Sequence, residues 1–168
     1  MQSRSYMGTE ITGAADMSEP IVRRKQVSAR NYAGMYTEID AGEYGVVVTD
    51  EPVAHGGTGE GPSPLQTVLG ALLGCESVTF SRTAKEMDFS YDGIEFDASY
   101  SIDIRGRMGV RGVTQHFQSV RVDAVVTTDE TEDRLRAVVE ETEARCPVFN
   151  LINDAGVPIE MRWVAKPR

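Results

Sequence analysis

The sequence predicts a single mixed domain in which one long helix accompanies two groups of antiparallel strands. Short β-rich segments separated by turns occupy residues 21–49, a well-capped helix begins at residue 63, and residues 94–125 contain two alternating stretches. A chain of 168 residues fits one domain with a core of its own. We expect residues 19–168 to form this domain and residues 1–18, which lack hydrophobic periodicity, to form a flexible N-terminal tail.

The N-terminal part of the domain is predicted to be a meander of short strands. Strand-like segments lie at residues 21–27, 35–39 and 44–49, and turn residues occupy positions 31–34 and 41–42 between them. The last segment is rich in β-branched valines, which favour strands.

The clearest helix start in the chain is at Ser63. Ser63 is a good N-cap, Pro64 suits the first helical position, and Gln66 completes a capping box. We expect the helix to continue to about Met87. Its predicted buried stripe comprises Leu65, Val68, Leu72, Cys75 and Thr79, broadened by Leu69, Leu73 and Phe80.

Two later segments alternate between apolar and polar residues and predict a long hairpin. They cover residues 94–104 and 117–125, with a glycine-containing loop at 105–112 between them. Each strand of such a hairpin is expected to bury one face.

Two helical pieces and an edge strand are predicted after the hairpin. Thr128 or Asp129 is expected to cap the first helix, and Cys146-Pro147 to begin a short second one. Residues 158–164, which hold the only tryptophan, are expected to form the edge strand.

Composition excludes several function classes. The net charge is −9 and the pI is about 4.7, so the chain lacks the basic face that nucleic acids and anionic membranes require. The longest apolar stretch, residues 68–75, is too short to span a membrane. The N-terminal residues contain no apolar segment typical of a secretory signal. We therefore expect a cytoplasmic protein that binds neither nucleic acid nor membrane.

Cys75 and Cys146 are the only cysteines. The cytosol keeps thiols reduced, so a permanent structural disulfide is not expected. Three interpretations remain: apolar core residues, metal ligands, or a redox pair. Free cysteine most often behaves as a small hydrophobic residue, and composition alone favours the first interpretation.

The local sequence separates the two thiols. Cys75 lies mid-helix, where burial raises a thiol pKa, so a reactive Cys75 needs a cation from elsewhere, and arginine suits best. Cys146 precedes Pro147 at a predicted helix start, with Arg145 beside it. The positive end of the helix and Arg145 are expected to favour the Cys146 thiolate. Alternatively, Pro147 only ends the preceding helix.

A metal site is not expected. Cys75, Cys146, His55 and His116 could in number supply a Cys2His2 zinc site, but no CxxC or HxxxH spacing supports it. The glycine-rich loop at residues 56–61 lacks the Gly-Lys-Ser/Thr sequence of a phosphate-binding loop. Its glycines are expected to allow a close backbone approach.

Several motifs carry a family resemblance when they are taken together and in order. They are Asp50-Glu51-Pro52, Gly56-Gly57, Gly61-Pro62-Ser63-Pro64-Leu65, Leu72-Leu73-Gly74-Cys75 and, much later, Arg145-Cys146-Pro147-Val148. This combination resembles the OsmC/Ohr family of osmotically inducible and organic hydroperoxide resistance proteins, and in particular a less characterised branch with a GPSP-type helix start. The resemblance extends from about Ile21 to Val164.

The resemblance implies an α+β, OsmC-like fold: an intertwined homodimer with a long central cysteine-bearing helix wrapped by curved antiparallel sheets. The small residues Gly70, Ala71 and Gly74 are compatible with close helix packing. It further implies a thiol-dependent peroxidase without a cofactor. Cys75 matches the cysteine that attacks an organic hydroperoxide and becomes a sulfenic acid, and Cys146 matches the resolving cysteine. A dithiol reductant, dihydrolipoyl groups in the best-known members, then restores both thiols.

The sequence departs from the family at the arginine and glutamate that support the reactive cysteine. Arg30 best matches the family arginine, with Arg23 and Arg24 as further candidates. At the start of the central helix, where peroxidases carry a glutamate, only Gln66 offers a polar group. Gln66 can accept one hydrogen bond from arginine but supplies no charge.

That departure keeps a second hypothesis open. In it, the protein is a non-catalytic member that binds an apolar small molecule or senses redox state. A weaker third hypothesis is a metal-binding redox protein. Retention of both cysteines favours the enzyme.

Overall fold

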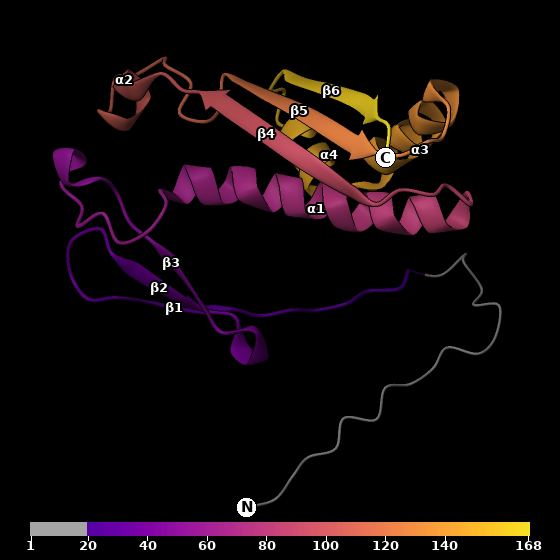
Figure 1. Ribbon diagram of the computed structural model, residues 1–168. Coiled ribbons are helices and arrows are strands. Elements are labelled where there is room, and N and C mark those ends of the chain that lie inside the picture. Colours follow the sequence, from indigo (N-terminus) through magenta and orange to yellow (C-terminus); the bar gives the residue numbers. More distant parts are fainter. Residues whose placement is uncertain (1–19) are drawn as a thin grey trace, which may run out of the picture.

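The computed structural model describes residues 20–168, and the predicted tail at residues 1–18 lies outside the described residues. A long central helix, α1 (Pro64–Glu86), lies between two three-stranded sheets (Figure 1). Two further helices, α3 (Glu132–Arg145) and α4 (Pro147–Asp154), pack against α1. The predicted α+β class is therefore confirmed.

The first sheet is an antiparallel meander. Its strands β1 (Ser28–Asn31), β2 (Thr37–Asp40) and β3 (Val46–Thr49) are paired in that order. The expected strand at residues 21–27 is wrong, because the first strand begins only at Ser28. Ser28 pairs with Asp40, the last residue of β2, so the chain before Ser28 has no strand opposite it.

The loop before α1 is organised by the buried carboxylate of Asp50. Asp50 Oδ2 accepts hydrogen bonds from the Thr58 hydroxyl at 2.6 Å and from the backbone N–H groups of Thr58 and Glu60. Gly57 lies so close to the Glu51 carbonyl that any side chain there would overlap with it. The glycine-rich loop thus serves a close backbone approach, as predicted, and it fixes the chain just before the helix.

The start of α1 is as predicted. Ser63 Oγ accepts the N–H of Gln66 at 3.3 Å, Gln66 Oε1 accepts the N–H of Ser63 at 2.9 Å, and Pro64 occupies the first turn. The predicted buried stripe is confirmed at Leu69, Leu72 and Phe80 but is wrong at Val68 and Cys75. The buried residues are Leu69, Leu72, Glu76, Phe80, Thr83 and Ala84, whereas Val68 is exposed and Cys75 is half-buried.

The second sheet contains the predicted hairpin. Strands β4 (Gly93–Ser101) and β5 (Ser119–Thr127) pair antiparallel over nine residues, and β6 (Ile159–Lys166) lies at the edge. Ile104 does not extend β4 as expected. It begins a short helix, α2 (Ile104–Arg107), because the Asp103 side chain accepts the N–H of Arg105.

The edge strand β6 runs parallel to β5, so the second sheet is mixed rather than purely antiparallel. Helices α3 and α4 lie between these strands in the sequence and provide the crossover that a parallel pair requires. The N-cap of α3 is Thr131, not Thr128 or Asp129. Thr128 instead donates its hydroxyl to the Ser90 carbonyl at 2.6 Å.

The core lies between α1, the second sheet and the two C-terminal helices. One cluster surrounds Leu72 and includes Val120, Val122 and Ile152. The other surrounds Phe80, whose ring stacks on Trp163 at a centroid distance of 5.3 Å. All of these contacts engage one side of α1.

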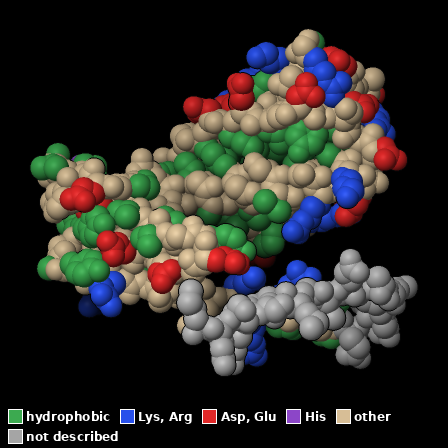
Figure 2. All heavy atoms as spheres, turned by 60° about the horizontal axis from the view of Figure 1, so that its bottom comes forward, with side chains coloured by type: hydrophobic (Ala, Val, Ile, Leu, Met, Phe, Trp, Pro, Cys, Tyr) green, Lys and Arg blue, Asp and Glu red, His purple; other side chains and the backbone are tan. Residues whose placement is uncertain are grey.

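The first sheet lies on the other side of α1 (Figure 1), and several residues on that side of the helix are exposed. Val68 and Val78 are 43% and 52% exposed, and a methyl group at Gly70 or Gly74 would meet no atom within 4 Å. Seen from the side of the first sheet, hydrophobic side chains gather in several patches on the surface (Figure 2). Within residues 20–168, none of the helices is long and apolar enough to cross a membrane.

Candidate redox site

The first thiol, Cys75, lies in the middle of α1. It is adjacent in sequence to the buried stripe, and its side chain is half-buried. The N-terminal turn of α4 packs against this part of the molecule, with Val148 and Phe149 resting on the cluster around Leu72. Within residues 20–168, the core clusters pack on one side of the helix that carries Cys75, and the Cys75 side chain is not fully buried.

The second thiol, Cys146, lies at the junction of α3 and α4 and is fully buried. Pro147 begins α4, and the N–H of Phe149 points at Cys146 Sγ at 3.5 Å, so the thiol is the helix cap as predicted. The side-chain amide of Asn150 donates to the carbonyls of Cys146 at 2.9 Å and Glu143 at 3.0 Å. These bonds fix the junction, and with it the direction of the Cys146 side chain.

The fold brings the two thiols together although 71 positions (146 − 75) separate them in the sequence. Cys146 interacts with both Cys75 and the adjacent Glu76. Burial is the first cause that raises the pKa of the Cys146 thiol well above its usual range, and the neighbouring side chains of Cys75 and then Glu76 add to it. The Phe149 N–H opposes the rise only in part. The buried site thus favours the protonated thiol of Cys146, with Cys75 as its neighbour.

The expectation that the helix end and Arg145 favour a Cys146 thiolate is wrong. Burial outweighs the helix N-terminus, and Arg145 points away from the thiol. Its guanidinium pairs with Glu86 of α1 and Glu141 of α3 instead. Arg145 links the two helices on the surface.

Glu76 is the member of this site that the sequence analysis missed. Its side chain is fully buried, and neither carboxylate oxygen has a hydrogen-bond partner within the described part of the chain. Burial raises the pKa of Glu76 to about 7, the Cys146 thiol opposes that rise, and the charge of Glu143 adds to it. A glutamate in a helix is ordinarily expected to face solvent, and only its phase with Leu72 and Phe80 indicates burial.

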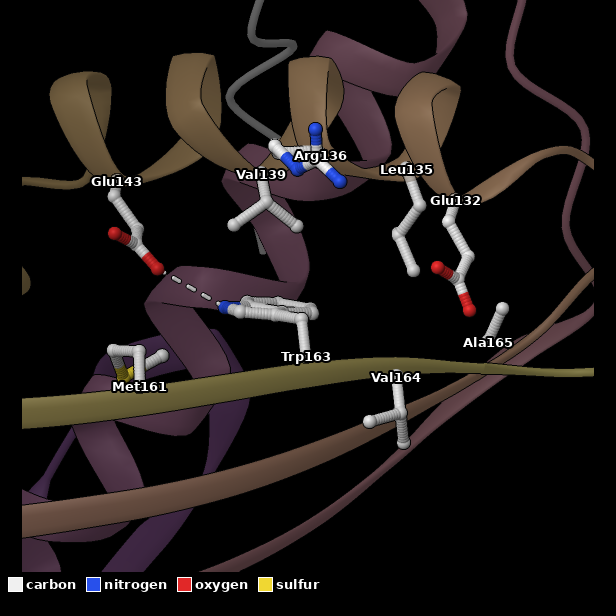
Figure 3. Close-up of a pocket in the computed structure, with 9 residues that line it drawn as sticks. All are labelled: Glu132, Leu135, Arg136, Val139, Glu143, Met161, Trp163, Val164 and Ala165. Carbon is white, nitrogen blue, oxygen red and sulfur yellow. Dashed lines mark hydrogen bonds between the residues drawn. The ribbon is translucent and has the colours of Figure 1, made fainter.

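Glu143 connects the site to a hollow between α3 and β6 (Figure 3). Its carboxylate accepts the indole N–H of Trp163 at 3.1 Å, and the two side chains point toward each other across the hollow. Burial raises the pKa of Glu143, and the Trp163 bond opposes the rise. The other lining residues include Leu135, Val139 and Met161, and neither cysteine is among them.

A second hollow of largely apolar character runs between α1 and β4. Gln66, Leu69, Gly70 and Leu73 line it from the helix, and Ala98, Ser99 and Tyr100 line it from the strand. Gln66 lies at one end, and its Oε1 atom is engaged by the N–H of Ser63. The hollow therefore begins at the N-terminal turns of the helix that carries Cys75.

Arg30 lies on β1, exposed, with its guanidinium 5.8 Å from the centroid of the Tyr32 ring. Among residues 20–168, no arginine forms a hydrogen bond or ion pair with either cysteine. The roles of Arg30 and Gln66 remain predictions. In the same part of the chain, no group of three or more His, Cys, Asp or Glu side chains is arranged to hold a metal ion.

Comparison with known proteins identifies the family. The sequence model described as "OsmC-like protein" matches residues 57–162, which is more than half of the chain and includes both cysteines. The chain belongs to the OsmC-like family. A search of curated proteins found no match.

Solved structures agree with the OsmC-like fold. An OsmC-like protein from Mycoplasma pneumoniae is 13% identical, with a TM-score of 0.71, over 88% of this chain and 99% of that one. The organic hydroperoxide resistance protein OsmC of Legionella pneumophila is 16% identical, with a TM-score of 0.64, over 86% and 98%. The corresponding OhrB of Bacillus subtilis is 20% identical, with a TM-score of 0.58, over 84% and 98%. At these identities the likeness concerns the fold.

The buried carboxyl of Glu76 should be visible in the pH dependence of stability. In the unfolded chain its pKa is near 4.5, and in the fold it is about 7, so the folded protein binds the extra proton between these values. The stabilisation of the folded state by proton binding at Glu76 is complete below about pH 4.5 and is lost as the pH rises through 7. We expect Glu76→Gln, which cannot ionise, to gain up to about 3 kcal/mol of unfolding free energy relative to the wild type across that window.

Urea unfolding of both proteins from pH 4.5 to pH 8, at one protein concentration, measures this difference. Glu95→Gln, at an exposed position of β4, is the matched control and should show no comparable change. A constant difference between Glu76→Gln and the wild type across the range would contradict the assignment of a buried, proton-binding carboxyl.

Proposed function

We propose that this OsmC-like protein is a cysteine-based peroxidase that reduces organic hydroperoxides. The single observation that carries the proposal is the unequal burial of two adjacent thiols. Cys75 is half-buried and can meet a substrate, whereas Cys146 is fully buried and faces Cys75. A pair of inert core thiols would have no reason to keep one sulfur accessible beside the other.

The first step takes place at Cys75. Its thiolate attacks the terminal oxygen of the hydroperoxide, an S–O bond forms, and the O–O bond breaks. The organic part leaves as an alkoxide that takes up a proton to give the alcohol. Cys75 is oxidised to a sulfenic acid and the hydroperoxide is reduced by two electrons. The thiolate is the reactive form, so this step needs a nearby cation, and Arg30 is our proposed source.

The second step uses Cys146. Its sulfur attacks the Cys75 sulfenic acid, an S–S bond forms, the S–O bond breaks, and water leaves. A dithiol reductant, such as a dihydrolipoyl group, then returns two electrons and two protons through thiol–disulfide exchange. The apolar hollow between α1 and β4 offers a surface for the organic part of the hydroperoxide. The name of the Legionella protein, an organic hydroperoxide resistance protein, supports this substrate class.

A non-catalytic, ligand-binding role is the alternative. The same apolar hollow favours it, as does the absence of a carboxylate at Gln66. The two proposals differ in one property: only the peroxidase loses its thiols to a hydroperoxide.

We expect one equivalent of an alkyl hydroperoxide to remove both thiols of the reduced protein within seconds, as measured by rapid quenching and thiol titration. Cys75→Ser should retain its remaining thiol unchanged. Cys146→Ser should lose its single thiol at the wild-type rate but stop at a trappable sulfenic acid. Thiols that persist for minutes in the wild type would contradict the peroxidase and favour the ligand-binding alternative.

We also propose that the open side of α1 is covered by a second copy of the chain. Val68 and Val78 leave an apolar stripe uncovered, and the bare positions Gly70 and Gly74 would let another backbone approach closely. The apolar residues Val46 and Val47 of β3 are exposed as well. A twofold symmetric dimer would bury such a surface on both copies at once.

Val78→Asp should weaken this dimer at least tenfold, because a carboxylate would be buried against apolar groups. Sedimentation velocity across a dilution series measures the change. Leu151→Asp, at an exposed apolar position of α4, is the matched control and should sediment like the wild type. A wild-type protein that sediments as a monomer at micromolar concentration would contradict the proposal.

A further inference from the structure

The resolving thiol, Cys146, needs a base that the two cysteines do not supply. Cys146 must lose its proton to attack Cys75, but its burial favours the protonated thiol. Arg145 does not help, because it is paired with Glu86 and Glu141 on the surface. A base beside the thiol is therefore needed within the buried site.

Glu76 is the candidate for that base. It follows Cys75 directly on α1, is fully buried, and is near enough to the Cys146 thiol for each to affect the pKa of the other. Neither of its oxygens has a hydrogen-bond partner within residues 20–168. A buried carboxylate without such a partner costs stability, and a structural role would be expected to supply one.

We propose that Glu76 is the general base that takes the proton from Cys146 when the disulfide forms. The proposal deepens the proposed function and rests on it for the sulfenic acid that Cys146 attacks. The carboxylate accepts the thiol proton as the S–S bond forms. The same proton then neutralises the hydroxide that leaves Cys75, so water departs and Glu76 is regenerated.

The ionisable groups around Glu76 are compatible with this role. Cys75 precedes Glu76 on α1, and Cys146 approaches it from the α3–α4 junction. The charge of Glu143 on α3 adds to the rise in the pKa of Glu76. Glu143 is held by the indole N–H of Trp163 on β6 (Figure 3). With the pKa of Glu76 at about 7, the carboxyl exchanges a proton readily at neutral pH.

An experiment without hydroperoxide separates this proposal from the peroxidase. One equivalent of dithiobis(nitrobenzoate) should label the accessible Cys75 rather than the buried Cys146. Attack by Cys146 on that mixed disulfide then releases a second thionitrobenzoate, and this second release is followed by its absorbance. The leaving group needs no proton, so the rate of this release reports the deprotonation of Cys146.

We expect Glu76→Gln to slow the release by about 100-fold, within the usual range for general base catalysis. Glu95→Gln is the exposed control and should match the wild type. In the wild type the rate should rise with pH and level off above about pH 7. In Glu76→Gln it should continue to rise to much higher pH, following the Cys146 thiol itself.

A wild-type rate in Glu76→Gln would overturn the proposal. If that variant fails to fold, as judged by circular dichroism, the wild-type pH profile decides: a tenfold rise per pH unit up to pH 9 overturns the proposal. A wild type that releases no thionitrobenzoate from labelled Cys75 also overturns it. If release depends on Glu76 but hydroperoxide leaves the thiols intact, the base role stands and the peroxidase proposal fails.

Discussion

The packing of the first turn of α4 against the middle of α1 is the contact on which the site depends. Val148 and Phe149 of this turn pack on the cluster around Leu72, and Cys146, which caps the turn, is fully buried. Glu76 on α1 is fully buried, and the adjacent Cys75 is half-buried. The difference in burial between the two thiols thus accompanies the packing of α3 and α4 on α1.

Because Cys75 and Cys146 differ in burial, these two chemically identical side chains suit different steps of the reaction. The more accessible sulfur suits the encounter with a substrate, and the buried one is shielded from oxidants other than Cys75 itself. Burial has a cost, since a buried thiol keeps its proton. In the proposed mechanism the buried carboxyl of Glu76 offsets this cost, because it accepts the Cys146 proton.

Much of the architecture follows from local sequence signals. The capping box at Ser63 and Gln66, the alternation along β4 and β5, and Pro147 after Cys146 depend on neighbours within a few residues, and all were predicted. The parallel direction of β6 was not, because pairing of distant strands depends on how α3 and α4 pack. Of the predicted α1 stripe, Leu69, Leu72 and Phe80 are buried, whereas Val68 is exposed, because two adjacent apolar residues such as Val68 and Leu69 leave the phase of the helix ambiguous.

The electrostatics of the site were harder to predict than its position. A helix N-terminus stabilises an anion by about 0.3–1 kcal/mol when exposed. Full burial can displace a pKa by about 3–5 units, which corresponds to roughly 4–7 kcal/mol. The sequence shows the helix start at Cys146 but not the extent of its burial, which the packing of α4 on α1 determines. The sequence therefore shows the smaller effect, which comes from the helix N-terminus, but not the larger effect, which comes from burial.

The most direct test of the central claim is to map the product of oxidation within the chain. Reduced protein is treated with one equivalent of an alkyl hydroperoxide, alkylated, digested and examined by mass spectrometry under non-reducing conditions. The account predicts one peptide pair joined by a Cys75–Cys146 disulfide within a single chain. Disulfides between chains, or a Cys75 oxidised to sulfinic acid with Cys146 still alkylated, would contradict it.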